Sequence, residues 1–243
     1  MSVIPLKSPV QQFYRSAPMP CPYLPGQIER KLFTRLAGAD ATEVNSALTR
    51  AGFRRSHDVV YRPVCPTCSS CVPVRIPVGQ FSPNRTMRRI RRQNADLSAA
   101  VLPPFATVEQ YQLFIAYQRS RHGAGEMARM AFADYAAMVQ DGSLSAAMIE
   151  FRDAAGVLVG CVLVDRVADG FSAVYSFFAA SERRPSLGTY LITALVDIAR
   201  GDGLDFIYLG YWIRNSTKMA YKSRFRPVEA LGRDGWAPLE FDL

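Results

Sequence analysis

The alternation of hydrophobic and polar positions is most regular in the second half of the chain. Thr107 is a typical helix N-cap, Gln110 stands at the capping-box position, and apolar side chains then recur at helical spacing. A similar apolar pattern covers residues 132–139. The sequence therefore predicts two consecutive helices.

Three strand-like runs follow these helices. They cover residues 146–151, 157–165 and 171–179. Short turns that carry Asp and Gly separate the runs, and this spacing is typical of an antiparallel meander. After the meander the pattern predicts a helix over 189–200, a strand over 205–212 and a helix over 216–225.

The first half of the chain is less regular and is rich in Arg, Cys and Pro. Pro103 and Pro104 favour a boundary, because proline neither continues a helix nor donates a backbone hydrogen bond to a sheet. We expect an Arg/Cys-rich N-terminal region over residues 1–104 and a second domain over residues 105–243. The element order of the second domain resembles the GNAT acyltransferase fold, an α/β (α+β) architecture. In that fold the fourth and fifth strands splay apart and hold the acyl group between them.

Composition narrows the class of protein. The chain has 243 residues, of which 49% are hydrophobic and 21% charged, a balance typical of globular rather than disordered or fibrous proteins. Its apolar runs are too short for a membrane span, and the N-terminus lacks the pattern of a signal peptide. We therefore expect a cytoplasmic protein without a membrane partner.

The chain is basic, with a net charge of +8 and a pI near 9.4. Such a charge indicates a polyanionic or acidic partner, although it could also serve solubility alone. The basic residues cluster, since five arginines fall between Arg85 and Arg92 in a helix-like run over residues 86–94. Positive charge without interleaved acidic residues favours contact with nucleic-acid phosphates.

The five cysteines leave two interpretations open. Their odd number and the missing signal-peptide pattern argue against a disulfide framework. Cys65, Cys68 and Cys71 form a C-x₂-C-x₂-C motif, and Cys21 could supply a fourth ligand to zinc or an iron–sulfur cluster. Free thiols packed beneath a turn fit the same spacing. Cys161 lies within a strand-like run and is expected to be a small core residue.

Four segments carry a resemblance to a known family. They are CPYLPGQIERKLFT (21–34), GFRRSHDVVYRPVCPTCSSCVPVRIPV (52–78), SAVYSFFAASERRPSLGTYLI (172–192) and YLGYWIRNSTKMAYKSRFRPVE (208–229). Together they resemble the arginyl-tRNA–protein transferase superfamily. The similarity is greatest to its short bacterial branch, the aspartate/glutamate leucyltransferases, and it spans nearly the whole chain.

The resemblance implies an enzyme that transfers leucine from leucyl-tRNA to the N-terminus of proteins beginning with Asp or Glu. Such transfer tags those proteins for degradation by the N-degron (N-end rule) pathway. Aminoacyl-tRNA is already an activated ester, so the chemistry is expected to require no cofactor, and zinc or an iron–sulfur cluster would be structural. The alternatives are an arginyl donor, a non-catalytic RNA-binding protein and a coenzyme A-dependent N-acetyltransferase.

Candidates for tRNA binding come from the basic run and from the turn before the helix at 189–200. Within ERRPSLGTY, Arg183 and Gly188 match the GNAT acyl-carrier loop, while Ser186 replaces its first glycine, a departure that disfavours coenzyme A. A helix that begins there would offer free N–H groups to a phosphate. The tRNA-binding candidates are Arg88, Arg89, Arg91, Arg92, Arg183 and Gly188.

Arginine is also the expected ligand of the acidic acceptor residue, because a guanidinium binds a carboxylate bidentately. The matching segments supply Arg54, Arg55, Arg62 and Arg75 as candidates. The catalytic candidates are Asp165, which could orient the acceptor amine, together with Tyr211 and Lys218 from the fourth segment.

Overall fold

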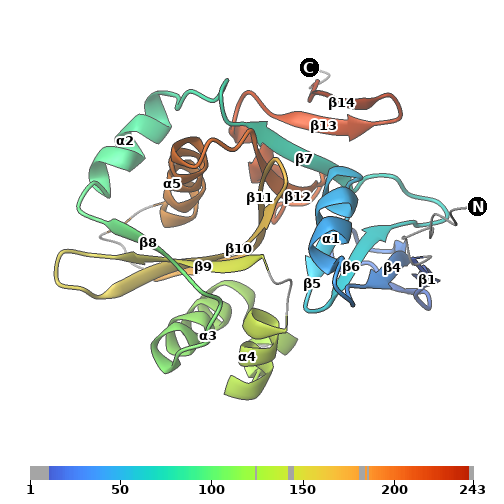
Figure 1. The fold of residues 1–243 in the computed structure, drawn as a ribbon, viewed down its shortest axis with the longest axis horizontal. Coiled ribbons are helices and arrows are strands. Elements are labelled where there is room, and N and C mark those ends of the chain that lie inside the picture. The colour runs from blue at the N-terminus through green and yellow to red at the C-terminus, as the bar shows by residue number, and fades with distance from the viewer. Residues whose placement is uncertain (1–10, 124, 142–144, 181–183, 185, 241–243) are drawn as a thin grey trace, which may run out of the picture.

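The protein has a mixed α/β fold, as the sequence predicts (Figure 1). The computed structural model describes residues 11–123, 125–141, 145–180, 184 and 186–240. Its largest element is an eight-stranded sheet with the order β14-β13-β7-β12-β11-β10-β9-β8. These strands are β7 (Val72–Pro77), β8 (Ser98–Leu102), β9 (Ala146–Arg152), β10 (Leu158–Val167), β11 (Gly170–Phe178), β12 (Phe206–Trp212), β13 (Glu229–Gly232) and β14 (Gly235–Pro238). No helix in the described part of the chain is long and apolar enough to cross a membrane.

The predicted antiparallel meander is confirmed at the centre of this sheet. β9 pairs with β10, and β10 pairs with β11, in both cases antiparallel. Along β10, Val162 and Val164 pack into one hydrophobic cluster, whereas Cys161 and Leu163 pack into another. Because successive side chains of a strand point to opposite faces, the meander is buried on both sides.

Helices cover both faces of the meander (Figure 1). α3 (Val108–His122) and α4 (Phe132–Gln140) lie on one face, and α2 (Arg85–Gln93) and α5 (Leu187–Gly201) lie on the other. The capping box of Thr107 and Gln110 is present, so the start of α3 is confirmed. The helix predicted at 189–200 and the strand predicted at 205–212 are confirmed as α5 and β12.

β11 and β12 separate soon after they meet. They run parallel only from the Gly170–Phe206 pair to the Ser172–Tyr208 pair. On its other edge β12 pairs with β7, with a register shift that ends at Gly210. Gly210 has a φ of +73°, a conformation that glycine adopts more readily than other residues. The splay of neighbouring strands that the GNAT resemblance implies is therefore present.

The helix predicted over residues 216–225 is wrong in its extent and type. Only a 3₁₀ segment, η2 (Ala220–Arg224), forms there. Lys222 and Phe225 are both buried and lie three residues apart. The 3₁₀ geometry places residues i and i+3 on the same side, so both side chains turn inward. Tertiary burial therefore decides the local conformation.

The N-terminal region contributes a separate four-stranded sheet with the order β1-β4-β6-β5. Its strands are β1 (Tyr14–Arg15), β4 (Lys31–Arg35), β5 (Arg54–Ser56) and β6 (Val59–Pro63), and β2 (Met19–Pro20) pairs with β3 (Ile28–Glu29) beside it. α1 (Ala41–Arg50) precedes β5, and η1 (Glu126–Arg129) follows α3. The eight-stranded sheet includes β7 and β8, which precede Pro103, and the division into two domains at residue 104 stays a prediction.

Candidate functional site

The splay between β11 and β12 opens into a cavity of about 550 Å³. Ala173 and Val174 from β11 and Leu209 from β12 line its strand side. A volume of this size is typical of sites that hold small organic groups. Its charged lining residues are Arg54, Glu126, Lys218 and Lys222.

Arg54 bridges the two splayed strands. Its Nη1 donates to the carbonyl oxygen of Leu209 at 3.0 Å, and its Nη2 donates to those of Ala173 and Val174 at 3.0 and 2.6 Å. A Cβ atom at Gly210 would lie 1.8 Å from Nη1, so glycine at this position makes room for the guanidinium. Arg54 therefore occupies the place where ladder hydrogen bonds between the strands would otherwise form.

Lys222 is the second cation of the splay. It lies on η2 with 5% of its surface exposed, and its Nζ donates to the carbonyl oxygen of Tyr211 at 2.7 Å. Burial lowers the pKa of Lys222 well below its usual value, and the charge of Arg54 lowers that pKa further. The lowered pKa shifts the equilibrium of Lys222 toward the neutral amine, which has a free electron pair.

A second cavity of about 460 Å³ adjoins the first at the N-terminus of α5. The two cavities share the lining residues Tyr117, Ser176, Ile192, Lys218 and Tyr221. The charged residues on the lining of the second cavity are all basic, namely Arg121, Lys218 and Arg224. Together with the helix N-terminus, these side chains create an electropositive groove suited to a phosphate.

The turn at the start of α5 explains part of the predicted acyl-carrier loop. Ser186 and Gly188 both line the second cavity. Ser186 has a φ of +63°, a left-handed conformation in which the glycine of the GNAT motif would be unstrained. A Cβ atom at Gly188 would lie 2.9 Å from the ring of Phe178, so this position also requires a small residue for packing. Arg183, the other residue predicted from this loop, lies outside the described residues.

The structure separates the four arginines predicted for the acidic acceptor. Among them, Arg54 lines the cavity. Arg55 is buried elsewhere in an ion pair with Asp165 at 2.7 Å, and Arg62 is exposed on β6. Arg75 is bound to Glu229 at 2.7 Å and its guanidinium lies over aromatic rings of the sheet.

The three predicted catalytic residues have different surroundings. Asp165 is fully buried and accepts hydrogen bonds from Arg55 and Asn45, and it is absent from the lining of both cavities. The Tyr211 hydroxyl donates to backbone carbonyl oxygens, so this side chain is held in the interior. Lys218 lies where the two cavities meet.

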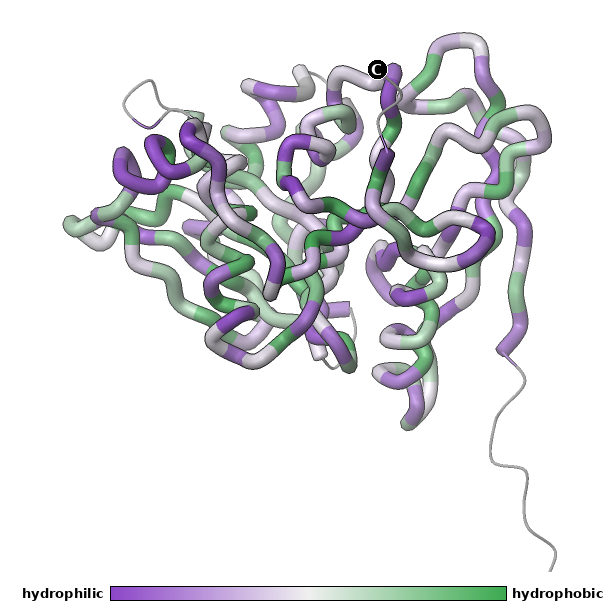
Figure 2. Tube along the Cα trace, turned by 90° about the horizontal axis from the view of Figure 1, so that it is seen from above, coloured by the Kyte–Doolittle hydropathy of each residue, from purple (hydrophilic) through white to green (hydrophobic). Residues whose placement is uncertain are grey.

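The predicted basic helix is confirmed as α2, whose mostly hydrophilic residues colour its trace purple in Figure 2. Met87 and Ile90 are buried beneath it, so the arginines face outward or sideways. Arg91 forms an ion pair with Asp197 on α5, and Arg88 donates to the carbonyl oxygen of Pro83 at 2.7 Å. Arg89 and Arg92 are exposed.

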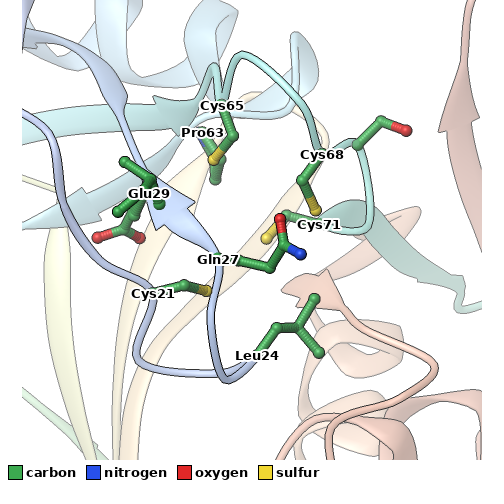
Figure 3. A pocket seen from close by; sticks show the side chains of 10 residues that line it. Cys21, Leu24, Gln27, Glu29, Pro63, Cys65, Cys68 and Cys71 are labelled. Carbon is green, nitrogen blue, oxygen red and sulfur yellow. The ribbon is translucent and has the colours of Figure 1, made fainter.

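The four cysteines considered as metal ligands surround one small cavity of about 40 Å³ (Figure 3). They are Cys21, Cys65, Cys68 and Cys71. Burial and the neighbouring cysteines raise the pKa of Cys71 to about 12, whereas hydrogen bonding with Ser70 lowers the pKa of Cys68. Within the described residues, no group of three or more His, Cys, Asp or Glu side chains is arranged to hold a metal ion.

Sequence reasoning missed three basic residues of the site. Lys222, Arg121 and Arg224 all line a cavity, and none of them was singled out. Lys222 and Arg224 lie in the fourth family-like segment, MAYKSRF, which offered a signal for them. Arg121 lies near the end of α3, where the sequence reads as an ordinary charged helix face.

Comparisons with known proteins agree on one family. The family model for the N-terminus of arginine-tRNA-protein transferases matches residues 19–89, and that for the C-terminus matches residues 109–232. An aspartate/glutamate leucyltransferase of Paramagnetospirillum magneticum is 51% identical, covering 97% of this chain and 96% of that protein. One from Gluconacetobacter diazotrophicus is 52% identical, covering 96% of this chain and 89% of that protein.

The similarity to solved structures is weaker. L-PGS from Bacillus licheniformis has a TM-score of 0.47 and 12% identity, covering 59% of this chain and 45% of that one. FemX has a TM-score of 0.45 and 8% identity, covering 74% of this chain and 63% of that one. The family models and the full-length relatives establish that this chain belongs to the arginine-tRNA-protein transferase family.

Proposed function

We propose that this protein transfers leucine from leucyl-tRNA to the N-terminus of proteins that begin with Asp or Glu. The observation that carries the proposal is the cavity in the β11–β12 splay, which adjoins an electropositive groove at the start of α5. A transferase needs these two spaces, one for the acyl group and one for its carrier. The full-length relatives named aspartate/glutamate leucyltransferase support the choice of substrates.

The groove supports a polyanionic carrier. Arg121, Lys218 and Arg224 line it, and the N-terminal end of the α5 dipole adds partial positive charge. The phosphates at the 3′ end of tRNA fit this chemistry, and α2 would contact phosphates farther along the tRNA. Aromatic lining residues, such as Tyr117 and Tyr221, could stack on an unpaired base.

The charge of the cavity supports both an uncharged donor side chain and an acidic acceptor. Arg54 and Lys218 line the cavity as cations, against one lining carboxylate, that of Glu126. A third cation, the guanidinium of an arginyl donor, would be repelled there, whereas a carboxylate would be attracted. Of the four predicted arginines, Arg54 is the one that we propose for attraction of the acceptor carboxylate.

Transfer would result from placing the ester carbonyl and the acceptor amine next to each other. The ester carbonyl would lie between the splayed strands, where backbone N–H groups could polarise it. The α-amino nitrogen of the acceptor attacks this carbonyl, and the 3′ oxygen of the tRNA leaves. Because the ester is already reactive, alignment of the two substrates supplies much of the rate.

We propose that the reaction takes place in the cytoplasm and tags proteins for N-degron degradation.

We also propose that transfer requires no cofactor. Any zinc or iron–sulfur cluster at the cysteine cavity would then be structural. Elemental analysis of anaerobically purified protein, compared with its activity, tests the cofactor part. Metal-free protein that is fully active would exclude a required metal.

The decisive experiment is a transfer assay with charged tRNA and short peptides. With leucyl-tRNA and no ATP, a peptide that begins with Asp or Glu should gain one leucine, which mass spectrometry detects. A matched peptide that begins with Asn or Gln should react more than tenfold more slowly. It lacks the carboxylate, and an unpaired buried charge costs roughly 2–5 kcal/mol.

The same assay separates the alternatives. Preference for arginyl-tRNA would assign an arginyl donor, and the proposed location of the active site in the β11–β12 splay would be unchanged. Acetylation of the peptide from acetyl-coenzyme A would favour the N-acetyltransferase. If the protein binds tRNA but transfers nothing from either charged tRNA, the enzyme proposal fails and an RNA-binding protein replaces it.

A further inference from the structure

We propose that Lys222 is the general base of the transfer, and that its Nζ takes the proton that the acceptor nitrogen loses during attack on the ester. This inference rests on the proposed function and names the residue that carries one of its steps. It concerns a side chain that the sequence did not single out and that lies in the splay itself.

The geometry places Lys222 on the wall of the cavity proposed for the ester. Its side chain lines the cavity that Ala173, Val174 and Leu209 also line, so it shares the space proposed for the ester. The hydrogen bond of 2.7 Å from Nζ to the Tyr211 carbonyl fixes the amine at the strand that diverges. Beyond this bond, Nζ carries further hydrogens and, when neutral, a lone pair.

The surroundings of Lys222 contain more positive than negative charge. Among the described residues, no carboxylate forms an ion pair with it. Several charged and titratable groups surround it or face it across the cavity. They are Arg54 on β5, Cys71 before β7, Tyr211 on β12, Lys218 before η2, Tyr221 on η2, Glu126 on η1, and Tyr23, Tyr117 and Tyr175. Burial and Arg54 lower the pKa of Lys222, while Cys71 opposes this shift. A lowered pKa increases the fraction of the neutral amine, which is the form that acts as a base.

The proposed step conserves atoms and protons. The free α-amine of the acceptor forms a bond to the ester carbonyl carbon, and its nitrogen becomes positively charged. Lys222 removes one proton from that nitrogen and becomes an ammonium. The C–O bond to the 3′ oxygen breaks, and the ammonium returns the proton to this oxygen. The products are the peptide amide, tRNA with a free 3′ hydroxyl, and a neutral Lys222.

Other titratable groups fit this role less well. Asp165, which the sequence suggested could orient the acceptor amine, is enclosed by Arg55 and Asn45 and does not line the cavity. Lys218 lines the cavity, but it also lines the electropositive groove, where a charged ammonium would serve phosphate binding. Lys222 combines burial, contact with the splay and the absence of an ion-pair partner among the described residues.

The test is single-turnover transfer from pre-bound leucyl-tRNA to a saturating Asp-peptide, measured from pH 6 to pH 9 with correction for ester hydrolysis. Lys222→Met retains the shape of the side chain and removes the base. At pH 7 its rate should fall at least about 100-fold, the usual contribution of general base catalysis. The defect should shrink as the pH rises, because hydroxide then removes the proton.

Two further variants separate base catalysis from a merely positive charge. Lys222→Arg keeps the charge and a donor to Tyr211, but it cannot become neutral, so it should be as defective as Lys222→Met. Lys218→Met removes a neighbouring cation and should keep the wild-type shape of the pH profile, whatever its absolute rate. Circular dichroism and leucyl-tRNA binding confirm that each variant is folded.

The outcomes are distinct. A rate for Lys222→Met that is reduced by the same factor at every pH, or a normal rate for Lys222→Arg, would overturn the inference while the proposed function stands. If wild-type protein transfers nothing at any pH, the proposed function fails and the inference falls with it. Acetic anhydride labelling of wild-type Lys222 against pH needs no variant, and a titration at the ordinary lysine pKa would also overturn the inference.

Discussion

Two buried cations of this molecule have opposite environments. Arg55 has no exposed side-chain surface, and it faces the carboxylate of Asp165. Lys222 is almost as buried, but its observed partner is a neutral backbone carbonyl. A carboxylate partner keeps a buried cation charged, whereas burial without one favours the neutral form. The ion pair of Arg55 with Asp165 therefore serves the fold, whereas the burial of Lys222 without a carboxylate partner among the residues described favours a reactive amine.

The contrast is sharper because Arg54 and Arg55 are adjacent on β5. Successive side chains of a strand point to opposite faces, so one guanidinium enters the splay and the other reaches Asp165. The carbonyl oxygens that bind Arg54 leave its charge uncancelled, and this charge acts on Lys222. One dipeptide therefore contributes to both environments.

The largest expected effect comes from breaking the paired environment. Asp165→Ala leaves the Arg55 guanidinium buried without its carboxylate, and the free energy of unfolding should fall by about 3–5 kcal/mol. Denaturant unfolding measures this change. The matched control is Asp58→Ala, because Asp58 pairs with Arg35 at the surface and its loss should cost about 0–1 kcal/mol. Equal effects of the two substitutions would contradict the comparison.

A smaller effect is expected on the pH dependence of the free energy of unfolding, because Lys222 is buried without a carboxylate partner in the part of the chain that the structure describes. The pKa of Lys222 is lower in the folded protein than in the unfolded chain, so the unfolded chain binds more protons between the two values. The free energy of unfolding should therefore rise with pH through this window, by up to about 1.4 kcal/mol per pH unit, until the usual lysine pKa of about 10.4. The stability difference between wild type and Lys222→Met isolates this contribution. A difference that does not change between pH 7 and pH 10 would mean that Lys222 titrates normally.

The smallest expected effect extends the comparison to the surface arginines of α2. Arg91 is paired with Asp197, whereas Arg89 is exposed, and no ion pair involving it occurs among the described residues. Arg89→Ala should reduce the log–log salt slope of tRNA binding by roughly 0.7–0.9, and Arg91→Ala should reduce it less. Filter binding over a range of salt concentrations measures both slopes. Unchanged slopes in Arg88, Arg89, Arg91 and Arg92 variants would show that α2 does not contact tRNA.

The sequence by itself determined the elements whose signals are local. The Thr107–Gln110 capping box and the helical spacing after it fix the start of α3. The alternation and turns of residues 146–179 predict the meander, because sheet periodicity requires only neighbouring residues. The four family-like segments also identified the family, since long strings rarely match by chance.

Tertiary structure alone decided which of these residues meet. Arg54 and Arg55 are indistinguishable in sequence. The strand carbonyl oxygens that bind Arg54 and the carboxylate that binds Arg55 lie 110 to 155 residues away along the chain. The segment 216–225 reads as a helix, but the burial of Lys222 and Phe225 overrides its periodicity. The electrostatic state of Lys222 depends on solvent exclusion and on Arg54, which only the folded chain brings to it. Local pattern therefore fixes most of the secondary structure, while desolvation and long-range contacts decide which charges remain reactive.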